Sequence, residues 1–312
     1  MSLISVVVPV YWNAESLPLL KAELETIADA LPDDRFEFIF VDDGSGDGSY
    51  AVLEGLAQVD ERVRVLRLSR NFGSNPAILA GLSTVTGDCA AVISADLQDP
   101  PSKIPEMVAE WRGGSQVVMA ARAIRHDPMT SRFFGSAFNY LFKRFVFPDF
   151  PRHGFDFMLL DRQVVDVLVD LQEKNSYIFG QVMWVGFERS VIFYERQERQ
   201  HGQSRWTTAK KIKYFVDAFS AFSYLPLRLA TMMGFLMAGL GFLYTLLIVI
   251  LRITNEVPVT GWASTTVVVL LAAGTQLILL GILGEYLWRV LDESRNRPPY
   301  IIRNTVNPPA EK

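Results

Sequence analysis

Acidic and amide side chains directly follow two of the apolar runs in the sequence. Asp42 and Asp43 come after the run at 36–41, and Asp96 and Gln98 come after another such run. Carboxylates can accept hydrogen bonds from a nucleobase or a ribose, and they can hold a divalent metal on a pyrophosphate. Asp96 and Gln98 are two positions apart, so in an extended segment they project toward one side. These residue types therefore fit a site for a nucleotide and a metal ion.

Strand and helix patterns alternate along the first part of the chain and would position these side chains. Such an alternation is typical of an α/β fold with a mostly parallel sheet that helices cover on both sides. Ligands bind such sheets at the carboxyl ends of the strands, and the polar clusters at 11–13, 42–45, 70–71 and 96–98 fall at those ends. We predict strands at 4–10, 36–41, 63–68, 89–94 and 117–121, and helices at 15–31, 48–60 and 75–86.

Several well-known kinds of site are absent from the sequence. Gly44, Gly46 and Gly48 lack the spacing of a dinucleotide fingerprint, and no P-loop, H-E-x-x-H or G-x-S-x-G motif is present. The single cysteine, Cys89, excludes an intrachain disulfide and a cysteine-based zinc site. The histidines are scattered, and we interpret them as surface or hydrogen-bonded side chains: His126, His153 and His201.

Charge is distributed unevenly along the chain. Residues 1–112 carry 8 Lys and Arg against 18 Asp and Glu, whereas the remainder of the chain is net basic. This division suggests an acidic part for catalysis or metal binding and a basic part that faces an anion.

The C-terminal part of the chain is unusually apolar. Residues 229–251 and 257–284 carry no charged side chain, and each run exceeds the roughly 20 residues that a helix needs to cross a bilayer. A pair of buried core helices is the alternative, but core helices of that length rarely lack charge on every face. We predict transmembrane helices at 229–251 and 264–288, which argues against a wholly soluble or nucleic-acid-coating protein.

Basic residues flank the two predicted spans, whereas the short link between them carries Arg252 and Glu256 as its charges. The positive-inside rule therefore places both flanks, the large N-terminal domain and both termini in the cytoplasm. Apolar stripes with basic borders at 131–147 and 207–228 fit helices that lie in the headgroup layer. Ordinary core-facing helices are the alternative, and the second segment favours the membrane surface because it leads straight into a span.

Six stretches of the sequence resemble the inverting glycosyltransferases of family 2, which have a GT-A fold, and they occur in that family's order. They are most similar to the polyprenyl-phosphate glycosyltransferases, which include dolichyl-phosphate mannose synthases and bactoprenol glucosyltransferases of the GtrB type. The two predicted spans favour the GtrB-like branch. The stretches are VVVPVYWNAE, VDDGSGDGS, LSRNFGSNPAILAGL, SADLQDPPSKIP, GFDFMLLDR and RQHGQSRW.

The hydropathy pattern and the resemblance together predict how the chain is divided. A cytoplasmic GT-A catalytic domain would occupy 1–206, and an amphipathic interfacial helix would follow it. The spans would come next, and the chain would end in a cytoplasmic tail. The implied segments after the catalytic domain are 207–228 for the interfacial helix, 229–251 and 264–288 for the spans, and 289–312 for the tail.

The resemblance further implies roles for individual residues. Asp96 would hold the metal on the donor diphosphate with help from Gln98, and Asp156 would lie near the acceptor or the sugar. Asp156 could instead cap a helix at 159–169, and some of the basic residues could be ordinary surface charges. The nucleotide-sugar pocket would be formed by Pro9, Tyr11, Glu15, Asp42, Asp43, Arg70 and Asn71. Phosphate or acceptor groups would be bound by Arg122, Arg132, Ser136, Arg199, Ser204 and Arg205.

One position departs from the pattern of this family. Relatives usually carry D-x-D-x-Q, and Ser94 stands at the first of these acidic positions. A hydroxyl binds a hard cation more weakly than a carboxylate does. Either Asp96, Gln98, the diphosphate oxygens and water suffice to hold the metal, or the metal site is weakened.

The expected reaction is inverting transfer of a hexose to a polyprenyl phosphate on the cytoplasmic leaflet, with Mg²⁺ or Mn²⁺ as cofactor. Glucose from UDP-glucose is expected from the resemblance alone. A second hypothesis is a processive polysaccharide synthase. Arg205 and Trp206 fit its Q-x-x-R-W motif, but Gly202 replaces the glutamine, and two spans cannot easily enclose a polymer channel.

A third hypothesis, suggested by Ser94, is a non-catalytic nucleotide-binding scaffold. The membrane-embedded glycines and the interfacial helices would permit a homo-oligomer. No nucleic-acid partner is expected.

Overall fold

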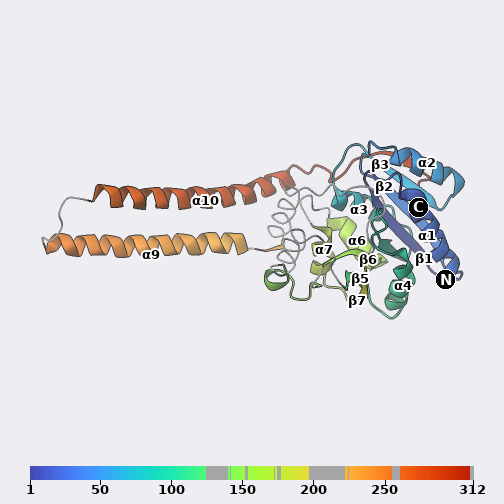
Figure 1. The fold of residues 1–312 in the computed structure, drawn as a ribbon, viewed down its shortest axis with the longest axis horizontal. Coiled ribbons are helices and arrows are strands. Elements are labelled where there is room, and N and C mark those ends of the chain that lie inside the picture. The colour runs from blue at the N-terminus through green and yellow to red at the C-terminus, as the bar shows by residue number, and fades with distance from the viewer. Residues whose placement is uncertain are drawn as a thin grey trace. The chain divides into compact units, whose positions relative to one another are not determined.

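The computed structural model describes most of the chain. The chain divides into two compact units, Met1–Ala218 with Pro298–Lys312 and Phe219–Arg297, and each is described by itself (Figure 1). The predicted interfacial segments at 131–147 and 207–228 lie largely outside the described residues. The described residues are 1–123, 140, 142–151, 154–171, 173, 177–196, 222–223, 225–254 and 261–309.

The first unit is built on a mixed β-sheet, which has eight strands in the part of the chain that the structure describes. Its central strands β1 and β2 are rich in Val, Ile and Phe, because such side chains fit a sheet that is buried on both faces. Every residue of β4 and of β5 is buried. In order across the sheet, the strands are β7 (Arg189–Tyr194), β5 (Val117–Arg122), β6 (Phe155–Asp161), β4 (Cys89–Val92), β1 (Leu3–Val10), β2 (Arg35–Asp42), β3 (Val63–Leu68) and β8 (Ile302–Val306).

The direction of β6 brings its first residues to the edge of the sheet where most other strands end. β6 pairs antiparallel with both β4 and β5, whereas β4, β1, β2 and β3 pair parallel with one another. β7 is parallel to β5. Asp156, the second residue of β6, therefore lies at the same edge as the carboxyl ends of β1, β2, β3, β4, β5 and β7. Ligands of such sheets bind at this edge.

Helices cover both faces of the sheet, as the sequence predicts. On one face, α1 packs its apolar side chains against alternate residues of β1, such as Leu20 against the core that contains Val8. On the other face, Gly81 of α3 lies so close to Val7 and Val41 that an added Cβ would come within 3.0 Å of Val7. The helices are α1 (Leu17–Ala30), α2 (Ser49–Val59), α3 (Ser74–Leu82), the short 3-10 helix η1 (Pro101–Lys103), α4 (Ile104–Arg112), α6 (Arg162–Leu171) and α7 (Ile178–Trp184).

The second unit contains two long apolar helices, α9 (Leu225–Ile253) and α10 (Trp262–Ser294), which contact each other. Within them, Leu227–Leu251 and Val267–Ser294 have mean hydropathies of 2.3 and 2.4 and are long and apolar enough to cross a membrane. Large apolar side chains on both helices are exposed, for example Phe235 at 75%. Each helix contains one predicted span, at 229–251 and 264–288, and extends beyond it at both ends.

The segment after α10 returns to the first unit and forms β8, which pairs antiparallel with β3. Ser69 N–H donates to the Ile301 carbonyl at 2.9 Å, and Asn307 Nδ2 donates to the Val63 carbonyl at 2.9 Å. The predicted tail at 289–312 therefore contains a strand of the main sheet. This strand was not predicted from the sequence, because its run is short, polar and far from its partner in the chain.

Candidate active site

The loops that follow β1 and β2 are hydrogen-bonded to each other. Trp12 N–H donates to Ser45 Oγ at 3.0 Å, and Asn13 N–H donates to Ser49 Oγ at 2.9 Å. Trp12 has a left-handed φ of 61°, and its side chain lies beside Gly46 with 38% of the residue exposed. The two loops thus present an aromatic ring at the edge of the sheet where β1 and β2 end, which we call the functional edge. There the ring can stack on a planar group.

Asp43 holds the loop that follows β3. Its carboxylate accepts hydrogen bonds from Phe72 N–H at 2.7 Å and Gly73 N–H at 2.9 Å. Burial raises the pKa of Asp43 from 3.8 to about 6, and the nearby Asp42 raises it too, whereas the two backbone amides lower it. Both carboxylate oxygens therefore bind the backbone that leads into α3, and Asp43 shapes this part of the site.

Asp42, at the end of β2, is completely buried, with 0% exposure. Its Oδ1 accepts a hydrogen bond from Ser45 N–H at 3.0 Å. Its Oδ2 has no hydrogen-bond donor among the described residues and lies 3.7 Å from Arg67 Nε. A buried acceptor without a donor is uncommon in proteins. Asp42 Oδ2 is therefore suited to accept a hydrogen bond from a ligand.

The exposed residues of the predicted donor pocket lie on neighbouring loops. The Arg70 guanidinium lies over the Phe72 ring at 4.0 Å and donates to the Asn71 carbonyl at 3.2 Å. This loop packs on Gly44, which has a φ of 71° and where a Cβ would come closer than 3.0 Å to the Arg70 backbone. The other predicted pocket residues belong to β1 and the segment after it, and they are the half-buried Pro9 and Tyr11 and the exposed Glu15.

A second polar cluster lies in the turn that follows β4. Ser94 Oγ is 2.9 Å from Asp96 Oδ1 and 2.7 Å from Asp99 Oδ2. Gln98 N–H donates to Asp96 Oδ1 at 3.2 Å, and Leu97 between them has a left-handed φ of 58°. This tight turn brings the three residues that the sequence suggests as metal ligands, Ser94, Asp96 and Gln98, to one place.

Asp99 follows this turn and contacts Ser94, and it was not predicted from the sequence as a site residue. It is fully buried, its Oδ1 accepts a hydrogen bond from the Tyr194 hydroxyl of β7, and Arg196 Nε lies 3.9 Å from the same oxygen. Burial raises the pKa of Asp99, although Arg196 opposes this shift. Burial and the adjacent Asp99 also raise the pKa of the Tyr194 hydroxyl. The position of Asp99 in the DLQD run after a strand is the signal that could have identified it.

Arg122, at the end of β5, forms an ion pair with Asp156 at the start of β6. The Arg122 side chain is 8% exposed and that of Asp156 is 49% exposed. Burial alone would lower the pKa of Arg122, but the charges of Asp156 and Asp99 raise it. Asp156 therefore faces the edge with Arg122 behind it, and the alternative in which Asp156 caps a helix at 159–169 is wrong because 155–161 form β6.

The residues available for a metal are few. The described residues contain no group of three or more His, Cys, Asp or Glu side chains that could hold a metal ion. The oxygen atoms of Ser94, Asp96 and Gln98 nevertheless match the ligand preference of a hard divalent cation, provided that a bound nucleotide supplies further oxygens. The remaining residues predicted to bind phosphate lie outside the described residues, and they are Arg132, Ser136, Arg199, Ser204 and Arg205.

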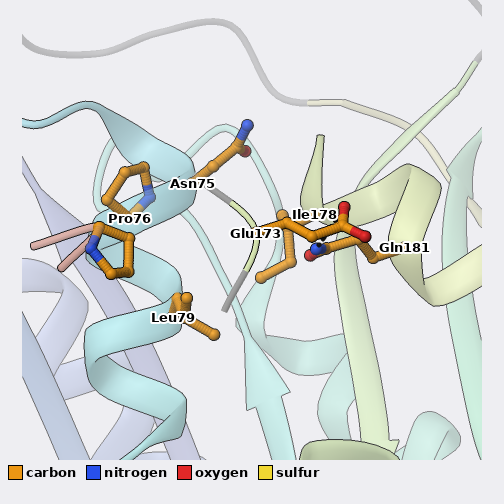
Figure 2. A pocket seen from close by; sticks show the side chains of 7 residues that line it. Asn75, Pro76, Leu79, Glu173, Ile178 and Gln181 are labelled. Atoms are coloured by element: carbon orange, nitrogen blue, oxygen red, sulfur yellow. Dashed lines mark hydrogen bonds between the residues drawn. The ribbon is translucent and has the colours of Figure 1, made fainter. Parts of the chain in front are cut away.

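A separate pocket lies between α3, α7 and the segment before β8 (Figure 2). Gln181 Nε2 donates to Glu173 Oε2 at 3.3 Å, and these two side chains lie opposite those of α3 in Figure 2. None of the residues that the sequence predicts for the site lines this pocket. Its lining consists of Asn75, Pro76, Leu79, Glu173, Ile178, Gln181 and Pro299.

An α/β sheet with carboxylates clustered at one edge fits a nucleotide-sugar enzyme, and comparison with known proteins agrees. The family described as Glycosyl transferase family 2 matches residues 5–169. The chain belongs to this family and is a glycosyltransferase.

Relatives match nearly the whole chain. The uncharacterized glycosyltransferase YkcC of Bacillus subtilis is 38% identical over 96% of this chain and 93% of its own length. The bactoprenol glucosyl transferase of Shigella phage SfV is 35% identical over 96% of this chain and 98% of its own. The resemblance predicted from the sequence motifs is confirmed.

Solved structures show the same GT-A fold. Mannosyl-3-phosphoglycerate synthase from Rubrobacter xylanophilus has a TM-score of 0.50 and 19% identity, covering 69% of this chain and 72% of that one. Glucosyl-3-phosphoglycerate synthase from Mycobacterium tuberculosis, solved with Mn²⁺, UDP-glucose and phosphoglyceric acid, has a TM-score of 0.50 and 17% identity, covering 70% and 79%. These similarities support the predicted fold class.

Proposed function

We propose that this glycosyltransferase transfers a hexose from a nucleotide-sugar to a polyprenyl phosphate. The observation that carries the proposal is the match to bactoprenol glucosyl transferases, which extends over 96% of the chain and so includes both long apolar helices. A lipid acceptor resides in a membrane, and these helices are suited to hold the enzyme there. We propose UDP-glucose as the donor.

The proposed reaction inverts the anomeric carbon. A phosphate oxygen of the acceptor attacks that carbon in line, the new carbon–oxygen bond forms, and the nucleoside diphosphate leaves with the electron pair of the broken bond. A phosphate monoester has a second pKa of about 6, so it is already largely dianionic and needs no strong base. Asp156, half-exposed and paired with Arg122, would orient the acceptor or the sugar rather than remove a proton.

A divalent cation, Mg²⁺ or Mn²⁺, is part of the proposal. Asp96 and Gln98 would hold it, and Ser94 would add a neutral oxygen. When bound, such an ion stabilises the negative charge of the departing diphosphate. Asp42 and the loops around Arg70 would bind the nucleoside part of the donor.

We also propose a membrane topology. If α9 and α10 cross a bilayer, they do so between β7 and β8, which are strands of one sheet. Both flanks of the helix pair must then lie on the same side, and the basic flanking residues favour the cytoplasm. A homo-oligomer stays a prediction.

The test is transfer in vitro with the purified enzyme, labelled UDP-glucose, Mn²⁺ and undecaprenyl phosphate. We expect a lipid that carries a single sugar. Long polymer would instead support a processive synthase, and no transfer from any nucleotide-sugar in a panel would contradict the proposal and leave the scaffold hypothesis.

Asp96→Ala should lower the rate of this transfer at least 100-fold, because Asp96 would be the main protein ligand of the metal. Asp166→Ala is the matched control, since Asp166 is an exposed aspartate on α6 that pairs with Arg162. Full activity of Asp96→Ala would show that the metal assignment is wrong.

A further inference from the structure

The hydroxyl of Ser94 lies between two carboxylates. Its oxygen is 2.9 Å from Asp96 Oδ1 and 2.7 Å from Asp99 Oδ2. A hydroxyl has one proton and two lone pairs, so it can donate to one of these oxygens at a time. If one carboxylate accepts the hydroxyl proton, the Ser94 oxygen turns its lone pairs toward the other carboxylate.

Asp99 is the better acceptor for this proton. It is fully buried, and a buried carboxylate that lacks hydrogen bonds is costly. Its Oδ1 accepts from the Tyr194 hydroxyl, while the donor that the structure shows for its Oδ2 is Ser94. Asp96 Oδ1 differs, because it also accepts from the backbone N–H of Gln98 at 3.2 Å.

When Ser94 donates to Asp99, its lone pairs turn toward Asp96. Two oxygen atoms then lie 2.9 Å apart with no proton between them, an arrangement that an intervening cation would stabilise. In an octahedral Mg²⁺ site with metal–oxygen distances of about 2.0–2.1 Å, neighbouring ligand oxygens are about 2.9 Å apart. The spacing of Ser94 Oγ and Asp96 Oδ1 therefore matches one edge of such a site.

We infer that Asp99 and Tyr194 are positioning residues that orient the Ser94 hydroxyl as a neutral ligand for the divalent cation beside Asp96. The inference rests on the proposed function, because it concerns the metal of that site. The hydroxyl would then bind the cation, and Asp99 lies one hydrogen bond behind it, 2.7 Å from the Ser94 oxygen.

The experiment measures Mn²⁺ binding to the purified full-length enzyme in detergent with saturating UDP, using the electron paramagnetic resonance signal of free Mn²⁺. Loss of an outer-shell partner typically weakens metal binding 10–100-fold. We expect Tyr194→Phe, which removes a partner behind the ligand, to weaken Mn²⁺ binding about 10-fold, and Ser94→Ala, which removes the proposed ligand itself, to weaken it by at least about as much. Ser94→Thr keeps the hydroxyl and should stay close to the wild type.

Tyr300→Phe is the matched control for Tyr194→Phe. It also removes a tyrosine hydroxyl that donates a hydrogen bond, in this case to Ser83 Oγ at 3.0 Å, away from the turn after β4. Its Mn²⁺ affinity should equal that of the wild type. A thermal melt of each variant shows whether the protein is folded.

Two results would overturn the inference. One is unchanged Mn²⁺ affinity in Ser94→Ala. The other is a Tyr194→Phe variant with a lower melting temperature but unchanged Mn²⁺ affinity, which would make Tyr194 purely structural.

The proposed function can fail separately. A wild-type enzyme that binds Mn²⁺ through Ser94 but transfers no sugar to undecaprenyl phosphate would contradict the proposed function and support the inference. Sugar transfer that persists in the presence of a chelator, together with no Mn²⁺ binding, would support the proposed transfer and contradict the inference.

Discussion

The carboxylates at the functional edge differ in what they face. Asp43 is buried and binds the backbone amides of Phe72 and Gly73, whereas Asp156 is half-exposed and pairs with Arg122. A carboxylate such as Asp43 shapes a loop, whereas one such as Asp156 is available to a substrate. The role of such an aspartate therefore cannot be assigned from its residue type and its position after a strand. It also depends on the hydrogen-bond and ion-pair partners of its two carboxylate oxygens.

Asp43 should make stability depend on pH. Its pKa is raised from 3.8 to about 6 by burial, so between these values the folded chain binds more protons than the unfolded chain. Its contribution to folding is thus most favourable at low pH and is lost as the pH rises through about 6. We expect Asp43→Asn to remove this part of the pH dependence, on the order of 2 kcal/mol.

The measurement is the change in unfolding free energy between about pH 4 and about pH 7 for both proteins. Wild type should lose more stability over this interval than the variant. An equal loss in the two proteins would show that the pKa of Asp43 is not raised in the folded chain.

The sequence indicates part of the site and misses another part for a physical reason. Asp42, Asp96 and Gln98 stand directly after apolar runs, so their location at the edge could be predicted. Asp99 and Tyr194 are 95 residues apart in the chain. Their contact depends on where β7 lies in the sheet, which no local pattern encodes.

At the level of elements, apolar runs predict well where most strands lie in the sequence. They predict poorly which strands pair with each other in the sheet. The predicted strand at 63–68 coincides with β3, and the one at 4–10 differs from β1 by one residue. β6 was not predicted, because its run FDFMLLD leads into α6 and fits a helix or a strand equally. The antiparallel direction of β6 follows from long-range pairing rather than from its own sequence.

The close packing of α3 on the sheet makes a stability prediction. Gly81→Ala adds a Cβ that would come within 3.0 Å of Val7, and overpacking of this kind typically costs about 1–3 kcal/mol. Gly55→Ala is the matched control, because Gly55 lies within α2 with no atom within 4 Å of an added Cβ.

The control substitution should leave the melting temperature equal or higher, since alanine favours a helix by about 1 kcal/mol over glycine. Thermal denaturation of the two variants is the measurement. If Gly81→Ala were as stable as Gly55→Ala, α3 would not pack on β1 as the structure shows.

At the level of the whole molecule, the main sheet combines strands from both sides of the apolar helix pair. β8 covers the edge of β3, and an uncovered strand edge tends to pair with other chains. We expect a chain truncated after Arg297 to melt at a lower temperature and to self-associate.

A chain truncated after Pro309 retains β8 and serves as the control. Size-exclusion chromatography and thermal melts in detergent compare the two truncations. Monodisperse, equally stable protein from the shorter chain would mean that β8 is dispensable to the sheet.

The pairing of β8 with β3 also has a consequence for biosynthesis. Asn307 and Val63, which are hydrogen-bonded in the finished sheet, are separated by 244 residues, and α9 and α10 are made between them. During translation the β3 edge therefore stays open until the helix pair has left the ribosome. If α9 and α10 cross a bilayer as proposed, a chain whose second helix entered it in the wrong direction would deliver β8 to the opposite face, and the sheet would stay incomplete.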